Sequence, residues 1–232
     1  MITNTVLSER KPQRLAPPVL PASSECQQYF LTLLRSLPLE SNNAGDPVAT
    51  LGITSCYSGE GVTTVAVQLA LVAASTGLRV LLVDLNWKQP ALHKTFGAPA
   101  SPGVSEVLTQ GTPAEIPVQA SSFPNLSLLT AGSVAPRLPL LISLEKMQGL
   151  IHSLQADFDL IIFDLPASAK AGADVQVARL LDGVVLVVEA ERVRWEVATR
   201  VQELLVRSGA KVLGAVLNKR RQRIPKWLYR TL

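Results

Sequence analysis

A glycine-containing stretch with the sequence CYSGEGVTT, residues 56–64, stands between two apolar runs of the chain. In such a place the pattern G-x-x-x-x-G-K-[ST] binds phosphates: backbone amides surround the phosphate, the lysine contacts its terminal oxygens and the hydroxyl holds a metal ion. Here Val62 takes the position of the lysine. The remaining pattern predicts a phosphate-binding loop, with candidate binding residues Gly59, Glu60, Gly61, Thr63 and Thr64. An ordinary glycine turn is the alternative, and this stretch alone does not separate the two.

Three further apolar runs end in a carboxylate: RVLLVD at Asp84, LIIFD at Asp164 and VVLVVE at Glu189. Short aliphatic runs without alternation are typical of strands that are buried on both faces of a parallel sheet. Ligands bind at the carboxyl ends of such strands. The carboxylates are therefore candidate site residues, and the alternative for each aspartate is a solvated strand end.

The apolar runs alternate with helical patterns, which predicts an α/β fold: a doubly wound, mainly parallel sheet with helices on both faces. We expect strands at 48–55, 79–84, 126–130, 160–164, 184–189 and 211–218. We expect a first helix from Ser24 that stops before Pro38, and further helices at about 61–76, 143–156, 173–181 and 195–208. Residues 91–125 are expected to be rich in loops, with short helices.

The composition indicates one globular domain without metal or disulfide framework. The chain has 232 residues, of which 47% are hydrophobic and 5% aromatic, so an aliphatic core is expected. Cys26 and Cys56 are too few for a disulfide framework, and with His93, expected in a loop, and His152, expected on a helix surface, they make no metal site. No apolar stretch approaches the roughly 18 residues of a membrane span, and no signal peptide is evident. We therefore expect a cytoplasmic protein.

The formal net charge of +4 is unevenly distributed. Residues 211–232 hold seven of the 22 basic residues and none of the 18 acidic ones, which leaves a balance of −3 for residues 1–210. A basic charge confined to one end does not indicate nucleic-acid binding, and we expect none. The basic end is either a solvated segment or a contact with an anionic membrane surface, where each well-placed cation contributes about 1 kcal/mol.

The segment RVLLVDLNWKQPALHKTFG, residues 79–97, resembles a signature of the bacterial tyrosine kinase family, VLLIDxDxRxPxxHxxF. That family belongs to the MinD/ParA-like branch of P-loop ATPases and serves capsule and exopolysaccharide synthesis. The resemblance continues through PGVSEVL (102–108), NLSLLTAGS (125–133), DFDLIIFDLPAS (157–168), DGVVLVVEAERVR (182–194) and LGAVLNK (213–219). It implies a P-loop NTPase-like domain over 47–219. The residues themselves predict a proline-containing flexible arm over 1–23, a helix and loop over 24–46 and a basic tail over 220–232.

The resemblance also implies roles for single residues. It matches Asp84 and Asp164 to two carboxylates that organise magnesium and water, and Thr63 to the hydroxyl that holds the metal. It matches Asn218 to an asparagine that contacts adenine in related ATPases. ATP or ADP with magnesium would be the cofactors, and the residues leave open whether they bind.

Departures from the family pattern concern phosphate chemistry. Val62 replaces the loop lysine, Asn86 the second aspartate of the D-x-D pair and Lys88 the arginine after it. MinD-type relatives place a second lysine early in the loop, but here Cys56 and Tyr57 stand there. No lysine within the loop can take over, so we expect no catalytic residue in this chain acting alone. Ser58 and Tyr57 are expected to be turn residues rather than nucleophiles.

Two more departures concern the family's assembly motif and the C-terminal tyrosines that it phosphorylates. The motif E-x-x-R-x-x-R, which supports ring assembly and coupling to the membrane partner, aligns with Glu25, Gln28 and Leu31, so both arginines are missing. The C-terminal tyrosine cluster is reduced to Tyr229. Homo-oligomer formation stays open.

These observations lead to one hypothesis and two alternatives. The hypothesis is a catalytically degenerate, tyrosine-kinase-like regulatory component of exopolysaccharide or capsule biosynthesis and export. It would bind the cytoplasmic segment of an inner-membrane polysaccharide co-polymerase and so lie at the inner membrane. The alternatives are a weak ATP-dependent protein tyrosine kinase or ATPase completed by a partner, and a ParA-like positioning protein.

Overall fold

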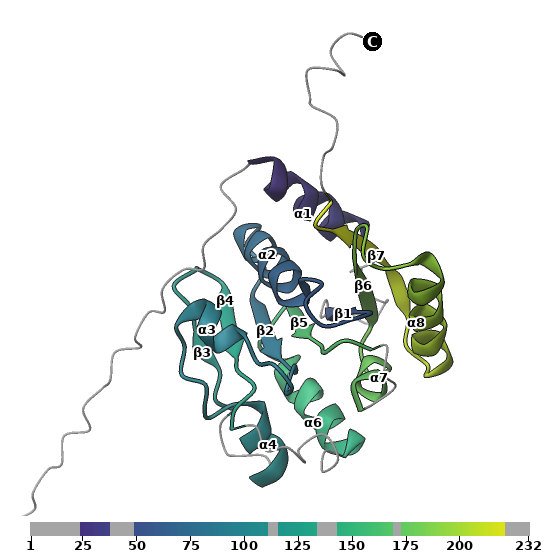
Figure 1. Cartoon of the computed structure of the whole chain (residues 1–232). Helices are drawn as coiled ribbons and strands as arrows, with labels where there is room; N and C mark the ends of the chain where they lie inside the picture. The colour runs from purple at the N-terminus through teal and green to yellow at the C-terminus, as the bar shows by residue number, and fades with distance from the viewer. Residues whose placement is uncertain (1–23, 38–48, 111–115, 134–142, 169–172, 221–232) are drawn as a thin grey trace, which may run out of the picture.

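The computed structural model describes residues 24–37, 49–110, 116–133, 143–168 and 173–220 (Figure 1). The described residues do not include the expected arm over 1–23, the loop over 38–46 or the tail beyond Arg220, which contains Tyr229.

Seven strands form one sheet in the order β3-β4-β2-β5-β1-β6-β7. Their bounds are Ala49–Ser55 for β1, Val80–Asp84 for β2, Gln119–Ala120 for β3, Leu126–Leu129 for β4, Leu160–Asp164 for β5, Gly183–Glu189 for β6 and Val212–Asn218 for β7. All neighbouring strands are parallel except β3 and β4, which are antiparallel. The predicted mainly parallel sheet is confirmed, and β3 is an addition because two residues are too short to give a pattern.

Helices cover both faces of the sheet, as predicted (Figure 1). α1 (Ser24–Ser36), α2 (Val62–Ser75) and α3 (Leu92–Phe96) contribute side chains to one apolar cluster. α4 (Val104–Gln110), α6 (Leu144–Leu154), α7 (Ala173–Ala178) and α8 (Trp195–Arg207) contribute to the other. All residues of β2 and β5 are buried between these two clusters, which explains their unbroken aliphatic sequences.

α2 is apolar around most of its circumference because the sheet lies on one side of it and α1 packs on the other. Gly77, with a φ of 97°, follows it in the left-handed conformation that ends many helices. α7 ends three residues before the predicted end, and His93 lies in helix α3 rather than in a loop. Among the described helices, none has both the length and the apolar character needed to cross a membrane.

Candidate functional site

The loop between β1 and α2 has the backbone of a phosphate-binding loop. Gly59 and Gly61 have φ angles of 89° and 95°, which residues with a Cβ atom rarely adopt. Gly61 is the N-cap residue of α2, and no side chain caps this helix end. Amide groups at such a helix N-terminus favour an anion. Thr63 and Thr64 lie in the first turn of α2, so the structure brings the predicted loop residues together around one helix end.

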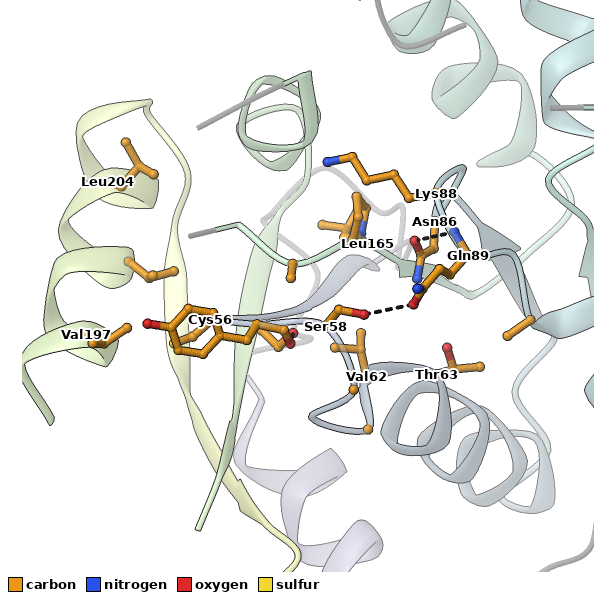
Figure 2. Close-up of a pocket in the computed structure, with 18 of the residues that line it drawn as sticks. Cys56, Ser58, Val62, Thr63, Asn86, Lys88, Gln89, Leu165, Val197 and Leu204 are labelled. Carbon is orange, nitrogen blue, oxygen red and sulfur yellow. Dashed lines mark hydrogen bonds between the residues drawn. The ribbon is translucent and has the colours of Figure 1, made fainter. Parts of the chain in front are cut away.

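Val62 stands where the pattern of a phosphate-binding loop has a lysine, so the loop lacks a cation there. Its side chain is only 8% exposed and belongs to the apolar cluster of α1 and α2. Two lysines outside the loop nevertheless line the same cleft as Val62: Lys88 and Lys94. Figure 2 shows Lys88 and Val62. The expectation that no lysine within the loop can take over is untouched, since both lysines come from the segment after β2.

Asp164 and Thr63 are joined by a hydrogen bond beside the loop. The hydroxyl of Thr63 donates to Oδ2 of Asp164 at 2.6 Å, and Oδ1 of Asp164 is buried without a partner among the described residues. Burial, followed by the negative charge of Asp84, raises the pKa of Asp164 to about 8. A buried carboxylate oxygen without a partner, next to a hydroxyl group, fits a magnesium ion. Thr63 and Asp164 would hold that ion.

Asp84 lies opposite Asp164 on the neighbouring strand. Its Oδ1 accepts the backbone N–H of Asn86 at 3.0 Å, and its Oδ2 accepts those of Ala91 and Leu92 at 3.0 and 3.1 Å. Burial raises the pKa of Asp84, although these amides act in the opposite direction. Asp84 therefore shapes the segment after β2, a role that the sequence did not reveal, and both of its oxygens already have backbone partners.

The end of β7 holds the loop through two successive carbonyl groups. Asn218 donates from Nδ2 to the carbonyl oxygen of Glu60 at 2.8 Å, and Lys219 donates from Nζ to that of Gly59 at 2.6 Å. The structure does not test the predicted contact of Asn218 with adenine, which stays a prediction. The side-chain amide nitrogen of Asn218 donates to the loop instead. Lys219 was missed because it was counted with the basic end of the chain, although its place directly after a strand could have identified it.

Glu189, at the end of β6, links two cations beside the loop. Its Oε2 is 3.2 Å from Nζ of Lys219 and 2.8 Å from Nη1 of Arg192. Hydrogen bonding to Arg192, followed by weaker contributions that include Lys219, lowers the pKa of Glu189. The sequence predicts Glu189 as a strand-end carboxylate at the candidate site without giving its role, and the structure pairs it with two cations that flank the loop.

The carboxylate of Glu60 lies buried within the loop. Its Oε2 accepts the backbone N–H of Cys56 at 3.0 Å, and burial raises the pKa of Glu60. Burial, with the charge of Glu60, also raises the pKa of Cys56 to about 11, so this thiol stays protonated. Ser58 donates to the side chain of Gln89 at 2.8 Å and so ties the loop to the segment after β2 (Figure 2).

A cleft of about 1400 Å³ opens beside the loop (Figure 2). The loop and the segment after β2 line one part of it, and α8 lines another. Its apolar lining includes Leu165, Val197, Val201 and Leu204. Its basic lining consists of Lys88, Lys94, Arg200 and Arg207.

The parallel sheet and the glycine loop at a helix N-terminus define a P-loop NTPase of the ParA/MinD class. A family model described as "ParA: NUBPL iron-transfer P-loop NTPase" matches residues 48–227. In the same class, MinD of Pyrococcus horikoshii, solved with Mg-ADP, has a TM-score of 0.65 at 24% identity over 79% of this chain and 76% of that chain. This last likeness concerns the fold alone.

Closer relatives are bacterial tyrosine kinases. The chain is 36% identical to tyrosine-protein kinase YwqD of Bacillus subtilis over 72% of this chain and 70% of that protein. It is 27% identical to tyrosine-protein kinase CpsD of Streptococcus agalactiae over 85% of both. The chimerical protein CapA2B2 matches in structure with a TM-score of 0.72, at 27% identity over 89% of this chain and 87% of that one. The chain belongs to the bacterial tyrosine-protein kinase family.

Proposed function

We propose that this chain is a catalytically degenerate tyrosine-kinase-like protein that regulates polysaccharide synthesis by binding a partner. The observation that carries the proposal is Val62: an apolar, almost fully buried side chain stands at the position where the loop needs a cation. The left-handed glycines, the uncapped helix end and the pair of Thr63 and Asp164 are otherwise in place.

The size of the missing interaction supports this reading. A charge-assisted hydrogen bond to phosphate contributes about 1.5–3 kcal/mol to binding. Its loss from a phosphoryl-transfer transition state, whose charge is spread over several oxygens, lowers the rate on the order of a thousandfold. Val62 offers neither charge nor donor, and Asn86 lacks the negative charge of the family's second aspartate. Both changes weaken chemistry more than they weaken the fold.

Binding of ATP or ADP with magnesium would be retained in a weakened form. The backbone amides from Gly59 to Thr64 would hold the phosphates, and Thr63 and Asp164 would hold magnesium, which neutralises phosphate charge. The Oδ1 of Asp164, which has no partner among the described residues, supports the metal, and the left-handed glycines at the uncapped N-terminus of α2 support the nucleotide. Binding would be weaker because Val62 offers the phosphates neither a charge nor a hydrogen-bond donor.

The resemblance to kinases of capsule and exopolysaccharide synthesis supports the biological setting. A chain that keeps the fold and lacks the phosphate cation is suited to act through binding. We therefore assign it the cytoplasmic segment of an inner-membrane polysaccharide co-polymerase as partner, and a place in the cytoplasm at the inner membrane through that partner.

Calorimetry with Mg-ADP and Mg-ATP tests the site. We expect Val62→Lys to bind at least about tenfold more tightly than wild type, because the restored contact contributes about 1.5–3 kcal/mol. Val62→Met, which adds length without charge, is the control and should leave the affinity unchanged. Wild type incubated with ATP and magnesium should show no robust autophosphorylation, and robust phosphorylation would overturn the proposal.

Lys88 and Lys94 favour a second candidate function, because they bring cations to the cleft that contains Val62. In this alternative the chain is a weak tyrosine kinase or ATPase that a partner completes. Adding the cytoplasmic segment of a co-polymerase should then raise ATP turnover, and Lys88→Met with Lys94→Met should abolish the rise. Unchanged turnover across a set of such segments would exclude this function.

A further inference from the structure

The cleft beside the loop is larger than a nucleotide site requires. It encloses about 1400 Å³, whereas small-molecule pockets enclose roughly 300–1000 Å³. The wall formed by α8 presents Val197, Val201 and Leu204 to the cleft, and Leu165 continues the apolar surface between α8 and the segment after β2 (Figure 2). This α8 wall is formed by elements that do not carry the phosphate loop.

The charges of the cleft lining are strongly unbalanced. Among the described lining residues, the cations Lys88, Lys94, Arg200 and Arg207 face a single carboxylate, Glu203. Glu203 is already paired with Arg207 at 3.0 Å. Phosphate binding at the loop would account for the two lysines, but Arg200 and Arg207 lie on α8. An excess of positive charge on an apolar wall favours an occupant that carries carboxylates as well as apolar groups.

Aromatic side chains extend the same surface. Trp195, the first residue of α8, is 75% exposed, and Tyr57, which lines the cleft, is 43% exposed. A shallow hollow continues along α8, lined by Trp195, Glu196, Thr199, Arg200 and Glu203. Exposed aromatic residues and arginines are enriched where proteins bind other proteins. The aliphatic wall of Val197, Val201 and Leu204 favours a peptide over a nucleic acid.

We propose that the cleft along α8 binds an acidic segment of a partner protein whose carboxylates are interspersed with apolar side chains. The proposal rests on the proposed function, in which the chain acts by binding a partner, and it adds the surface and the chemistry of that contact. The basic end of this chain is not the occupant of the cleft, because residues 211–232 carry seven basic residues and no acidic one. The same cleft of a second copy is equally repelled by its positive charge.

Fluorescence anisotropy of the full chain with a labelled peptide of alternating glutamate and leucine tests the proposal. We expect the peptide to bind, and the same peptide with glutamine in place of glutamate to bind at least about tenfold more weakly. Added NaCl should weaken the acidic peptide's binding. Arg200→Glu combined with Arg207→Glu should reduce affinity at least about tenfold. The control, Arg35→Glu with Lys211→Glu, makes the same charge change at exposed positions outside the cleft lining and should have no effect.

Absence of binding by wild type, or equal binding by the two double variants, would overturn the proposal. Preferential binding of labelled oligothymidylate, or self-association that the α8 variant abolishes, would also overturn it and assign the cleft to nucleic acid or to a second copy. Thermal unfolding checks that the variants fold, and Arg200→Gln with Arg207→Gln provides a milder pair that should weaken the peptide in the same direction. Robust autophosphorylation would overturn the proposed function and leave the peptide result standing, so the two failures can be told apart.

Discussion

The buried carboxylates of Asp84 and Asp164 determine the electrostatics of the site. They face each other on adjacent strands, and Val62 supplies no cation to offset them. The pKa of Asp164 is raised by burial and then by the charge of Asp84, so ionisation of both aspartates in the folded protein is opposed. A bound magnesium ion would relieve this repulsion.

The raised pKa of Asp164 predicts a pH dependence of stability. Its pKa rises from an ordinary 3.8 to about 8 on folding, so the folded state holds the proton more tightly than the unfolded state. This contribution is fully present below pH 3.8 and is lost as pH rises towards 8, by at most about 1.4 kcal/mol per pH unit. Asp164→Asn removes the dependence, so its melting temperature relative to wild type should increase between about pH 5 and pH 8 without magnesium. The exposed Asp157→Asn is the control, and parallel pH profiles for Asp164→Asn and wild type would contradict the prediction.

Residues whose roles depend on local spacing could be predicted from the sequence. The loop glycines and the strand-end aspartates follow from a short pattern and from the rule that ligands bind at the carboxyl ends of parallel strands. Lys88 and Lys94 could not be placed, since only the fold of the segment after β2 brings them into the cleft beside the loop. The use of Asp84 to hold backbone amides depends on a turn geometry that no spacing rule gives.

At the scale of elements, β7 is the strand that fixes the phosphate loop. It lies at one edge of the sheet, two strands from β1, yet its last residue reaches the carbonyl oxygen of Glu60, in the loop after β1, across β6. A Cβ atom at Gly61 would collide with the side-chain amide of Asn218, so loop and strand end fit only with glycine there. The rigidity of the loop therefore depends on an element that does not contain it.

Asn218→Ala should loosen the loop without unfolding the protein. One hydrogen bond is lost and the carbonyl group of Glu60 loses its partner, so the free energy of unfolding should fall by about 0.5–1.5 kcal/mol. Amide hydrogen exchange of residues 57–61 should become faster, and affinity for Mg-ADP should decrease. Gln202→Ala, at an exposed position of α8, is the matched control. Unchanged exchange in the loop would show that β7 does not hold it.

Glu106 of α4 joins two loops on the other side of the sheet. It accepts the backbone N–H groups of Gly103 and Ser133 at 2.7 and 2.8 Å and the hydroxyl of Ser101 at 2.8 Å. Burial opposes its ionisation, but these bonds outweigh burial and lower the pKa to about 2. The ionised Glu106 thus stabilises the loop that enters α4 and the one that leaves β4.

A Glu106→Gln variant should be less stable at neutral pH and similar to wild type in acid. A lowered folded-state pKa contributes stability above the ordinary value of 4.5, and this contribution is lost as pH falls towards 2. Because Glu106 is partly exposed, solvent screening limits the effect to about 1 kcal/mol. Urea unfolding at neutral and acidic pH measures it, with Glu145→Gln as the control on α6. An equal loss of stability at both pH values would contradict the ionic role.

The elements themselves were largely predictable, and the exceptions have physical reasons. The parallel strands and the helices α1, α2, α6 and α8 follow from aliphatic runs and helical spacing, within two residues at each end. β3 and α3 could not be assigned because segments this short carry too few residues for a period to appear. Their places depend on packing against β4 and β2, which the local sequence does not encode.

At the scale of the whole molecule, opposite charges are kept in separate regions. Residues 1–210 carry a balance of −3, yet the cleft lining within them is basic, and residues 211–232 add seven basic residues. A protein with this distribution can contact an acidic partner through the cleft and an anionic surface through its basic end without either contact competing with the other. The two contacts therefore predict separable losses of binding.

Deletion of residues 220–232 should remove binding to anionic membranes and leave the folded body intact. The deletion removes five basic residues and no acidic ones, so the formal net charge falls from +4 to −1. Each cation near an anionic surface contributes about 1 kcal/mol, so the apparent affinity for phosphatidylserine vesicles, measured by flotation, should fall by at least about a hundredfold. Phosphatidylcholine vesicles should bind neither form.

A variant with glutamine at Arg220, Arg221, Arg223, Lys226 and Arg230 keeps the length and the apolar residues of the tail and should lose binding to the same extent. Undiminished flotation of this variant would assign the contact to the apolar residues instead. The melting temperature and the binding of the acidic peptide should be unchanged by the deletion, because the core clusters and the cleft lining are made of residues before 220.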